Sequence, residues 1–454
     1  VAKEMHVGHL RTTVIGDSLV RMMEFLGNRV IRENHIGDWG TPFGMLIEHL
    51  VDLGEEQAAQ HLSLGDLDGF YKEARVKFDG SDEFQDRARE RVVLLQSGDA
   101  DTRRLWALLV GLSNQHFNTV YELLGVRLTD DDLAGESIYQ PLMPQVIERL
   151  RAGGLLTESD GADVVFPPGF TNRDGDPLPL IVQKGAGGFN YATSDLACVI
   201  DRVERLDADL MLYVVGAPQQ QHLQMVFAVA EMAGWLVPPV EAIHVTFGNV
   251  LGSDRKILKS RSGEPMKFAS LLHEAIERAG NAVAEKNPDL TSDERAGVAH
   301  MIGIGAVKYA ELSTDRVKDY VFDWDRMLSF DGNTGPYLQY AHARICSIFR
   351  RAGIDRSSVR ATSNLVDTPQ ERALALRLLA YPTAIGATLD TYSPHKLCTY
   401  VYDLATDFTS FYEHCPVLKA EEPVRSSRLA LADLAARTLR HALDLLGIDA
   451  PEQM

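Results

Sequence analysis

Cysteine is scarce in this sequence of 454 residues, and no two cysteines form a CxxC pair. Cys198, Cys346, Cys398 and Cys415 are scattered, which argues against a disulfide framework or a zinc knuckle and is typical of a reducing compartment. Long apolar runs are also missing, so no segment is expected to span a membrane, and the sequence does not start like a signal peptide. We therefore expect a cytoplasmic protein without a membrane partner.

Positive charge is in short supply as well. Lysine and arginine number 45 against 64 acidic residues, for a formal net charge of −19. This balance does not suggest a nucleic-acid partner, but a polyanion needs only a local basic surface. One such cluster consists of Arg255, Lys256, Lys259, Arg261 and Lys267. The length allows two or three domains with full cores.

Residues 6–9 form an HVGH string in which His6 and His9 bracket Gly8, ahead of an amphipathic stretch over residues 10–26. Apolar spacing predicts a helix there, and residues 29–34 read as a following strand. Two histidines three residues apart lie on one side of a first turn, and glycine permits close approach to the backbone. A helix N-terminus with two such donors indicates a phosphate site. The alternative is an ordinary packed histidine.

The order of elements indicates an α/β fold followed by an all-helical region. Residues 46–183 are mainly helical by periodicity, with a strand-like patch at 164–177, and resemble an insertion. From Met266 onward almost everything reads as helix. Between them helices and strands alternate, which predicts a parallel sheet with ligands at its carboxyl edge. The predicted elements are helix 193–206, strand 210–215, helix 221–234 and strand 242–247.

Several strings together resemble the arginyl-tRNA synthetase family, within the class I aminoacyl-tRNA synthetases. They are AKEMHVGHLRTT, NHIGDWGTPFGM, YATSDLA, KYAELSTDRVKDYVFDW and GPYLQYAHAR, and the closing LGIDAPEQM is similar too. The resemblance implies a Rossmann-like catalytic domain over 1–266 with a helical insertion over about 46–183. A helical connecting stem over 267–330 and an α-helical anticodon-binding domain over 331–454 would follow. Family members usually carry a further N-terminal domain, which we expect to lie upstream, and are usually monomers.

The resemblance implies that L-arginine is joined to tRNA(Arg) through an arginyl-adenylate, with ATP and Mg²⁺ as the substrate complex and no structural metal. His6 and His9 would donate to the ATP phosphates, and His9 would also lie near the arginine. Gly8 would let adenine lie against the backbone. Lys3 would add a cation.

The basic loop departs from the usual KMSKS pattern of this class. The aligned residues read LKSRS, with Arg261 where the catalytic lysine normally stands. Lys259 and Lys256 are the candidates to replace that lysine at the ATP phosphates. A solvated charge cluster is the alternative.

Arginine recognition is expected at YATSDLA. A carboxylate is the best partner for a guanidinium. Asp195 follows Tyr191 by four residues, so both face one way if a helix begins there. The resemblance assigns both to the guanidinium, Gln219 to the amino-acid end and His222 to ATP. The alternative for Asp195 is a charge that complements the helix dipole.

The helical end is expected to contact tRNA, because aromatic and cationic side chains interleave in GPYLQYAHARICSIFRR. The candidates are Tyr337, Tyr340, Arg344, Tyr412 and the final Met454, although some aromatics at helical spacing would belong to the core.

Two other functions remain open from the residues. One is an HxGH nucleotidyltransferase that acts on a small metabolite; the other is a synthetase-like protein that binds tRNA without catalysis. The YATSDLA and GPYLQYAHAR strings argue against the first, and the two retained histidines argue against the second.

Overall fold

The computed structural model describes residues 5–56, 58, 67–185, 188–258, 266–360 and 365–454. The chain divides into two compact units. The first unit contains residues 31–119 and 128–246, and the second contains residues 5–30, 120–127 and 247–454. Each unit is described by itself.

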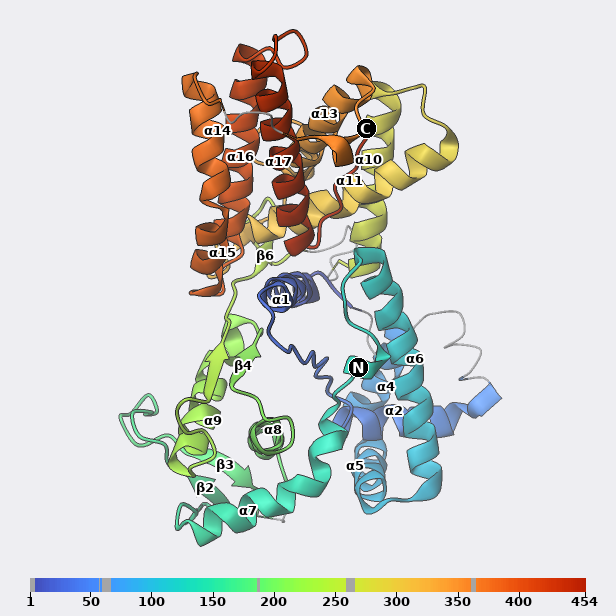
Figure 1. Cartoon of the computed structure of the whole chain (residues 1–454). Coiled ribbons are helices and arrows are strands. Elements are labelled where there is room, and N and C mark those ends of the chain that lie inside the picture. The colour runs from blue at the N-terminus through green and yellow to red at the C-terminus, as the bar shows by residue number, and fades with distance from the viewer. Residues whose placement is uncertain (1–4, 57, 59–66, 186–187, 259–265, 361–364) are drawn as a thin grey trace. The chain divides into compact units, whose positions relative to one another are not determined.

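The centre of the first unit is a pair of parallel strands, β4 (Leu210–Tyr213) and β5 (Glu241–His244). Helix α8 (Tyr191–Glu204) precedes β4, and helix α9 (Gln220–Met232) connects the two strands, as Figure 1 shows. Their apolar faces share one core, in which Leu196, Val199 and Val226 are fully buried. These elements match the predicted helix–strand alternation, and the parallel pairing is confirmed. In this crossover the chain runs from the carboxyl end of β4 through the 3-10 turn Ala217–Gln219 into α9.

The remainder of the first unit is largely helical, as the periodicity of residues 46–183 predicted. Short 3-10 turns over Asp130–Asp132 and Glu136–Leu142 precede α7 (Met143–Ala152). A small antiparallel sheet contains β1 (Thr157–Ser159), β2 (Ala162–Val165) and β3 (Leu180–Gln183). The helices before them are α2 (Thr41–Leu53), α4 (Leu67–Gly80), α5 (Asp82–Ser97) and α6 (Ala100–Leu124), of which α6 belongs to this unit up to residue 119.

The strand predicted over residues 29–34 is wrong. In the described structure this run forms no strand ladder and makes one isolated bridge, between Asn34 and Leu133. Its charged side chains bind neighbouring segments instead, since Arg32 pairs with Asp132 at 3.2 Å and Glu33 with Arg202 at 2.6 Å. Ion pairs therefore hold this segment in place of the strand pairing that the predicted order of strands and helices suggested.

The second unit begins with a short extended segment that leads into α1 (Gly8–Phe25). This segment pairs with the start of α10 (Phe268–Lys286): Val7 N–H donates to Met266 O at 3.0 Å, and Phe268 N–H donates to Met5 O at 2.9 Å. Helix α10 packs along α11 (Ser292–Leu312), and β6 (Val250–Leu251) pairs in parallel with β7 (Tyr320–Val321). The two hydrogen bonds flank His6 and fix the start of the HVGH turn against the start of α10.

The last part of the second unit is helical, as predicted, and β7 is a small exception to the helical composition after Met266. Helices α14, α16 and α17 lie side by side in Figure 1 and contact one another. In the part of the chain that the structure describes, none of the helices combines the length and apolarity needed to cross a bilayer. The helices are α12 (Trp324–Met327), α13 (Gly335–Ala352), α14 (Pro369–Leu379), α15 (Tyr381–Leu389), α16 (His395–His414) and α17 (Val424–Leu445), with a 3-10 turn at Arg356–Ser358.

Buried charges link α1 to other elements of the second unit. Arg11 pairs with Glu311 of α11, and both side chains are almost fully buried. Lys308, also on α11, donates to the carbonyl of Gly447 at 2.6 Å. Gly447 has φ +69°, and a Cβ there would lie 2.8 Å from Oδ2 of Asp17 on α1. Only glycine fits this junction without displacing the charged groups.

Candidate active site

The HVGH turn places the two predicted histidines together in the second unit. The ring centroids of His6 and His9 are 4.1 Å apart. Gly8 N–H donates to Nδ1 of His6 at 3.0 Å, and Nδ1 of His9 lies 3.1 Å from His6 N. The Nδ1 atom of each ring thus faces the local backbone. The predicted shared side of the first turn is confirmed.

Two features of this turn differ from an ordinary packed histidine pair. Burial and the neighbouring His6 lower the pKa of His9 to about 4, so its imidazole is neutral at pH 7. A Cβ on Gly8 would lie 2.6 Å from Cε1 of His6. Glycine is therefore required for the observed position of the His6 ring, a reason that the sequence did not suggest.

The basic loop begins after β6 in the second unit. Leu251 bridges Ile257, and Lys256 is exposed on the turn between them. Asp254 accepts the backbone N–H of Lys256 at 3.1 Å. Lys259 and Arg261 lie outside the described residues.

Lys3, the cation predicted near the HVGH string, also lies outside the described residues. Its role stays a prediction from the resemblance.

A second set of predicted residues meets in the first unit, at the start of α8. Asn190 caps this helix by accepting the backbone N–H of Ala192 at 3.1 Å. Tyr191 and Asp195 therefore occupy the first turns, as the spacing predicted. The His222 ring, on the first turn of α9, lies 2.5 Å from Oδ2 of Asp195 through Nε2 and packs edge-on against Tyr191. His222, which was predicted to bind ATP, thus directly contacts Asp195, the residue predicted to bind the guanidinium of arginine.

Gln219 ends the short turn Ala217–Gln219 that leads into α9, and it is exposed. It lies three residues before His222 in the chain. The contact of Gln219 with the amino-acid end of the substrate stays a prediction from the resemblance.

Sequence reasoning missed a second carboxyl group beside Asp195. Burial raises the pKa of Glu136 to about 7, and the negative charges of Asp195 and Asp38 add to this effect. Asp38 is itself buried, and Ser137 donates to it through both N–H and Oγ, at 2.9 and 2.6 Å. Three carboxyl groups thus occupy one region of the first unit and favour a cationic ligand. Glu136 stands in an acidic stretch that carries no motif, so no signal in the sequence marked it.

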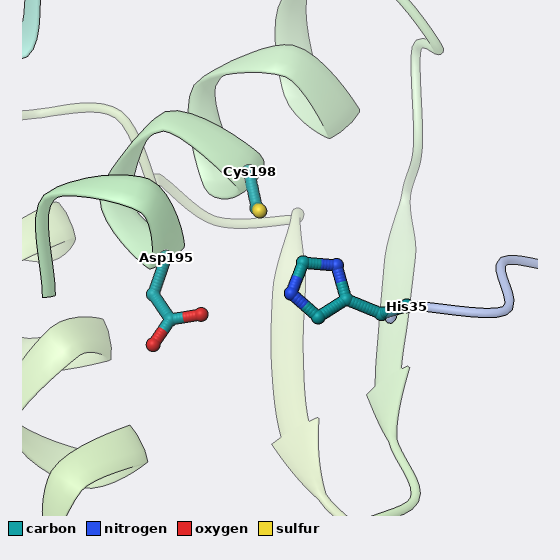
Figure 2. A group of neighbouring side chains, drawn as sticks. All are labelled: His35, Asp195 and Cys198. Atoms are coloured by element: carbon teal, nitrogen blue, oxygen red, sulfur yellow. The ribbon is translucent and has the colours of Figure 1, made fainter. Parts of the chain in front are cut away.

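His35 was also missed, although it lies in the quoted string NHIGDWGTPFGM. Its segment is held by hydrogen bonds from Ala134 N–H to Asn34 O and from Glu136 N–H to Ile36 O, both 3.0 Å. Figure 2 shows its ring reaching toward α8, beside Asp195 and Cys198. Partial desolvation and the cationic Arg202 lower the pKa of His35.

On the helical end, predicted tRNA-contacting residues take part in one cation–π pair and one aromatic pair. The guanidinium of Arg344 lies 4.6 Å from the ring centroid of Tyr412, and Tyr337 lies 5.8 Å from Tyr402. Tyr340 is 47% exposed and is free to stack on a ligand.

Two residues of this end are more enclosed than the sequence suggested. His342, in the string GPYLQYAHARICSIFRR that is expected to contact tRNA, is fully buried, and its Nδ1 lies 2.9 Å from Pro451 O. Met454 is half-buried against the α10–α11 core, and its carbonyl accepts a hydrogen bond from Asn287 at 3.2 Å.

Comparison with known proteins agrees with this architecture. Residues 1–324 match the family described as "tRNA synthetases class I (R), catalytic domain", and residues 338–454 match the "DALR anticodon binding domain". The fold and the site define a class I aminoacyl-tRNA synthetase.

Similarity to individual proteins narrows this class. The sequence is 57% identical to the arginine–tRNA ligase of Thermobifida fusca and 49% identical to that of Escherichia coli strain K12 / DH10B, in both cases over 100% of this chain and 79% of the relative. The chain belongs to the arginyl-tRNA synthetase family, the arginine–tRNA ligases, and joins arginine to tRNA.

Solved structures of the same family resemble this fold. The arginyl-tRNA synthetase of Plasmodium falciparum superposes with a TM-score of 0.86 at 32% identity and covers 100% of this chain and 75% of that one. The Thermus thermophilus enzyme gives a TM-score of 0.82 at 27% identity, with coverage of 100% and 80%.

Proposed function

We propose that the chain works in two steps, in which arginine is first activated by ATP and then transferred to tRNA(Arg). In the first step a carboxylate oxygen of arginine attacks the α-phosphorus of ATP. The bond to the β-phosphate bridging oxygen breaks, and pyrophosphate leaves. In the second step a terminal ribose hydroxyl of the tRNA attacks the arginyl carbonyl carbon. The bond from that carbon to the AMP phosphate oxygen breaks, AMP leaves, and the hydroxyl proton passes to solvent. The observation that carries this proposal is the fixed carboxylate of Asp195 at the start of α8.

The guanidinium is proposed to lie between Asp195 and Glu136. A planar cation with five N–H donors suits two carboxylates better than one. Glu136 is half-protonated near pH 7 without a ligand, and an arriving cation would favour its ionised form. His222 holds Asp195 in place from α9 and packs edge-on against the exposed ring of Tyr191, whose hydroxyl is proposed to meet the guanidinium. Gln219 is proposed to bind the amino-acid end.

The HVGH turn is proposed to bind the ATP phosphates. His6 and His9 would donate through Nε2 where negative charge develops on the α-phosphate, and Gly8 would leave room for the adenosine. ATP would enter as its Mg²⁺ complex, with the metal held mainly by phosphate oxygens. Lys3, Lys256, Lys259 and Arg261 are proposed to supply further positive charge.

The domain limits proposed are 1–266 for catalysis, with an insertion over about 46–183, 267–330 for the stem and 331–454 for anticodon binding. Tyr337, Tyr340, Arg344, Tyr412 and Met454 are proposed to form the tRNA-contacting surface. We further propose that the protein acts as a monomer in the cytoplasm.

Arginine-dependent exchange of radiolabelled pyrophosphate into ATP tests the proposed function, measured with and without tRNA(Arg). Exchange that requires arginine supports the adenylate. Exchange that depends on a different acceptor would overturn the proposal in favour of another nucleotidyltransferase. No exchange under any condition would overturn it in favour of a non-catalytic tRNA-binding protein.

A further inference from the structure

Three side chains with different ligand atoms converge in the first unit. The imidazole of His35, the carboxylate of Asp195 and the thiol of Cys198 offer atoms that all lie within 4.8 Å of one another. Asp195 and Cys198 are three residues apart on one side of α8, whereas His35 comes from the segment before α2 (Figure 2). Nitrogen, oxygen and sulfur donors thus face one point.

This donor set suits Zn²⁺ more than any hard cation. Zinc accepts Cys, His and carboxylate ligands at about 2.0–2.3 Å, which corresponds to roughly 3.3–3.8 Å between the ligand atoms of a tetrahedral site. Mg²⁺ and Ca²⁺ would prefer oxygen alone. Side chains that start within 4.8 Å need to close by about 1 Å. His35 can make that movement, since it is exposed and lies outside any helix or strand.

One ligand of the cluster has the hydrogen-bonded outer partner that metal ligands usually have. His222 Nε2 lies 2.5 Å from Oδ2 of Asp195, so the carboxylate is oriented by a group outside the cluster. An outer partner of this kind fixes a ligand of a zinc site. The ring of His35 packs 5.9 Å from the ring of Tyr139. Three protein ligands leave a fourth position for water.

We propose that one Zn²⁺ ion binds to His35, Asp195 and Cys198 and excludes arginine from its pocket. Binding replaces the S–H bond of Cys198 with a sulfur–zinc bond, and the proton passes to solvent. The competition rests on the proposed role of Asp195, because one carboxylate cannot serve the metal and the guanidinium together. Zinc would thus act as an inhibitor of arginine activation at this site.

Cobalt(II) is the direct probe, because it takes the same ligands and its absorption shows a thiolate bond. We expect the metal-free protein to bind one Co²⁺ with a thiolate-to-cobalt band that Zn²⁺ abolishes. Cys198→Ser should lose that band, and His35→Asn should weaken binding on the order of tenfold or more. Cys398→Ser, which removes another fully buried thiol, is the matched control and should bind like the unmodified protein.

His35→Asn keeps the test decisive if Cys198→Ser folds poorly, because His35 is exposed. The site is overturned if no thiolate band appears at one equivalent of Co²⁺, or if the band survives in Cys198→Ser.

Calorimetry of arginine separates the competition from the proposed function. One equivalent of Zn²⁺ should weaken arginine binding at least tenfold in the unmodified protein and have little effect in His35→Asn. Unchanged arginine affinity in the zinc-loaded protein would overturn the competition. The role of Asp195 is judged independently, by the loss of arginine binding in metal-free Asp195→Asn.

Discussion

The Nε2 atom of His222 and the Oδ2 atom of Asp195 lie 2.5 Å apart, although the two residues belong to different helices. This contact fixes the carboxylate from α9, and the side chains are only 16% and 21% exposed. A charge that merely complements the helix dipole would not need such a partner. The contact with His222 therefore favours the proposed ligand role of Asp195 over a helix-dipole role.

Asp195→Asn tests that role directly. The change keeps the shape of the side chain and removes its charge, so arginine should bind more weakly by roughly 3–5 kcal/mol, the cost of breaking a buried ion pair. ATP affinity should stay nearly constant, because ATP is proposed to meet other residues. Calorimetry with each ligand measures both effects.

Citrulline supplies the ligand-side control for Asp195, since it has the shape of arginine with a neutral urea. The unmodified protein should reject it, and Asp195→Asn should narrow the gap between the two ligands. Asp201→Asn, on the same helix but paired with Arg205, should leave the preference intact. An unaltered preference in Asp195→Asn would mean that this carboxylate has a structural role.

Glu136 should make arginine binding depend on pH. Its pKa of about 7 leaves it largely protonated at pH 6 and ionised at pH 8. Because a guanidinium favours the ionised carboxylate, affinity should rise as the pH rises through 7, and binding should release part of one proton. Calorimetry in buffers of different ionisation enthalpy measures that release. Glu136→Gln should bind more weakly at pH 8 and lose the pH dependence.

The same shift has a consequence for stability in the absence of arginine. The folded-state pKa of Glu136 lies above the usual value of 4.5, so the folded state binds the proton more tightly than the unfolded chain. That contribution is complete below pH 4.5 and is lost as the pH rises through 7. Glu136→Gln should therefore unfold at a higher temperature than the unmodified protein at pH 8, whereas Glu158→Gln on the exposed part of β1 should not.

His9→Ala should lower turnover without unfolding the protein. If the imidazole donates only where charge develops on the phosphate, the loss should be on the order of 10²–10³ in kcat, with arginine affinity little changed. His414→Ala, which removes an exposed helical imidazole, is the control. A variant that melts earlier at full turnover would support the packed-histidine interpretation.

Arg344→Ala tests the tRNA surface. The guanidinium lies 4.6 Å over Tyr412, and its loss should raise the KM for tRNA(Arg) by roughly tenfold, with the KM values of arginine and ATP unchanged. Arg278→Ala on α10 removes a similar cation from the ring of Trp324 on α12 and should leave the KM for tRNA unchanged. Equal effects of the two changes would assign Arg344 to helix packing.

Much of the catalytic architecture could be predicted from local patterns. Period and alternation gave α8, β4, α9 and β5, and the four-residue spacing brought Tyr191 and Asp195 to one side. The run over residues 29–34 was misread because its β-like composition hid charges that bind other segments. Glu136 and His35 could not be predicted as site residues, because only the folded chain brings them to α8. Contacts between residues that lie far apart in the sequence leave no signal in its local periodicity.

Disrupting the buried pair of Arg11 and Glu311 in the second unit should strongly lower the free energy of unfolding. Arg11→Met leaves the carboxylate of Glu311 buried without a counter-ion and also removes the bond to Lys318 O, so unfolding should be easier by about 3–5 kcal/mol. The double variant Arg11→Met, Glu311→Leu should recover much of that loss, because no charge is left uncompensated. Urea unfolding of the two single variants and the double variant measures the coupling.

Arg75→Met is the control, because it breaks an exposed pair with Asp79 and should lower the free energy of unfolding by at most about 0.5 kcal/mol. If Arg11→Met were as mild as Arg75→Met, the pair would not be what holds α1 against α11.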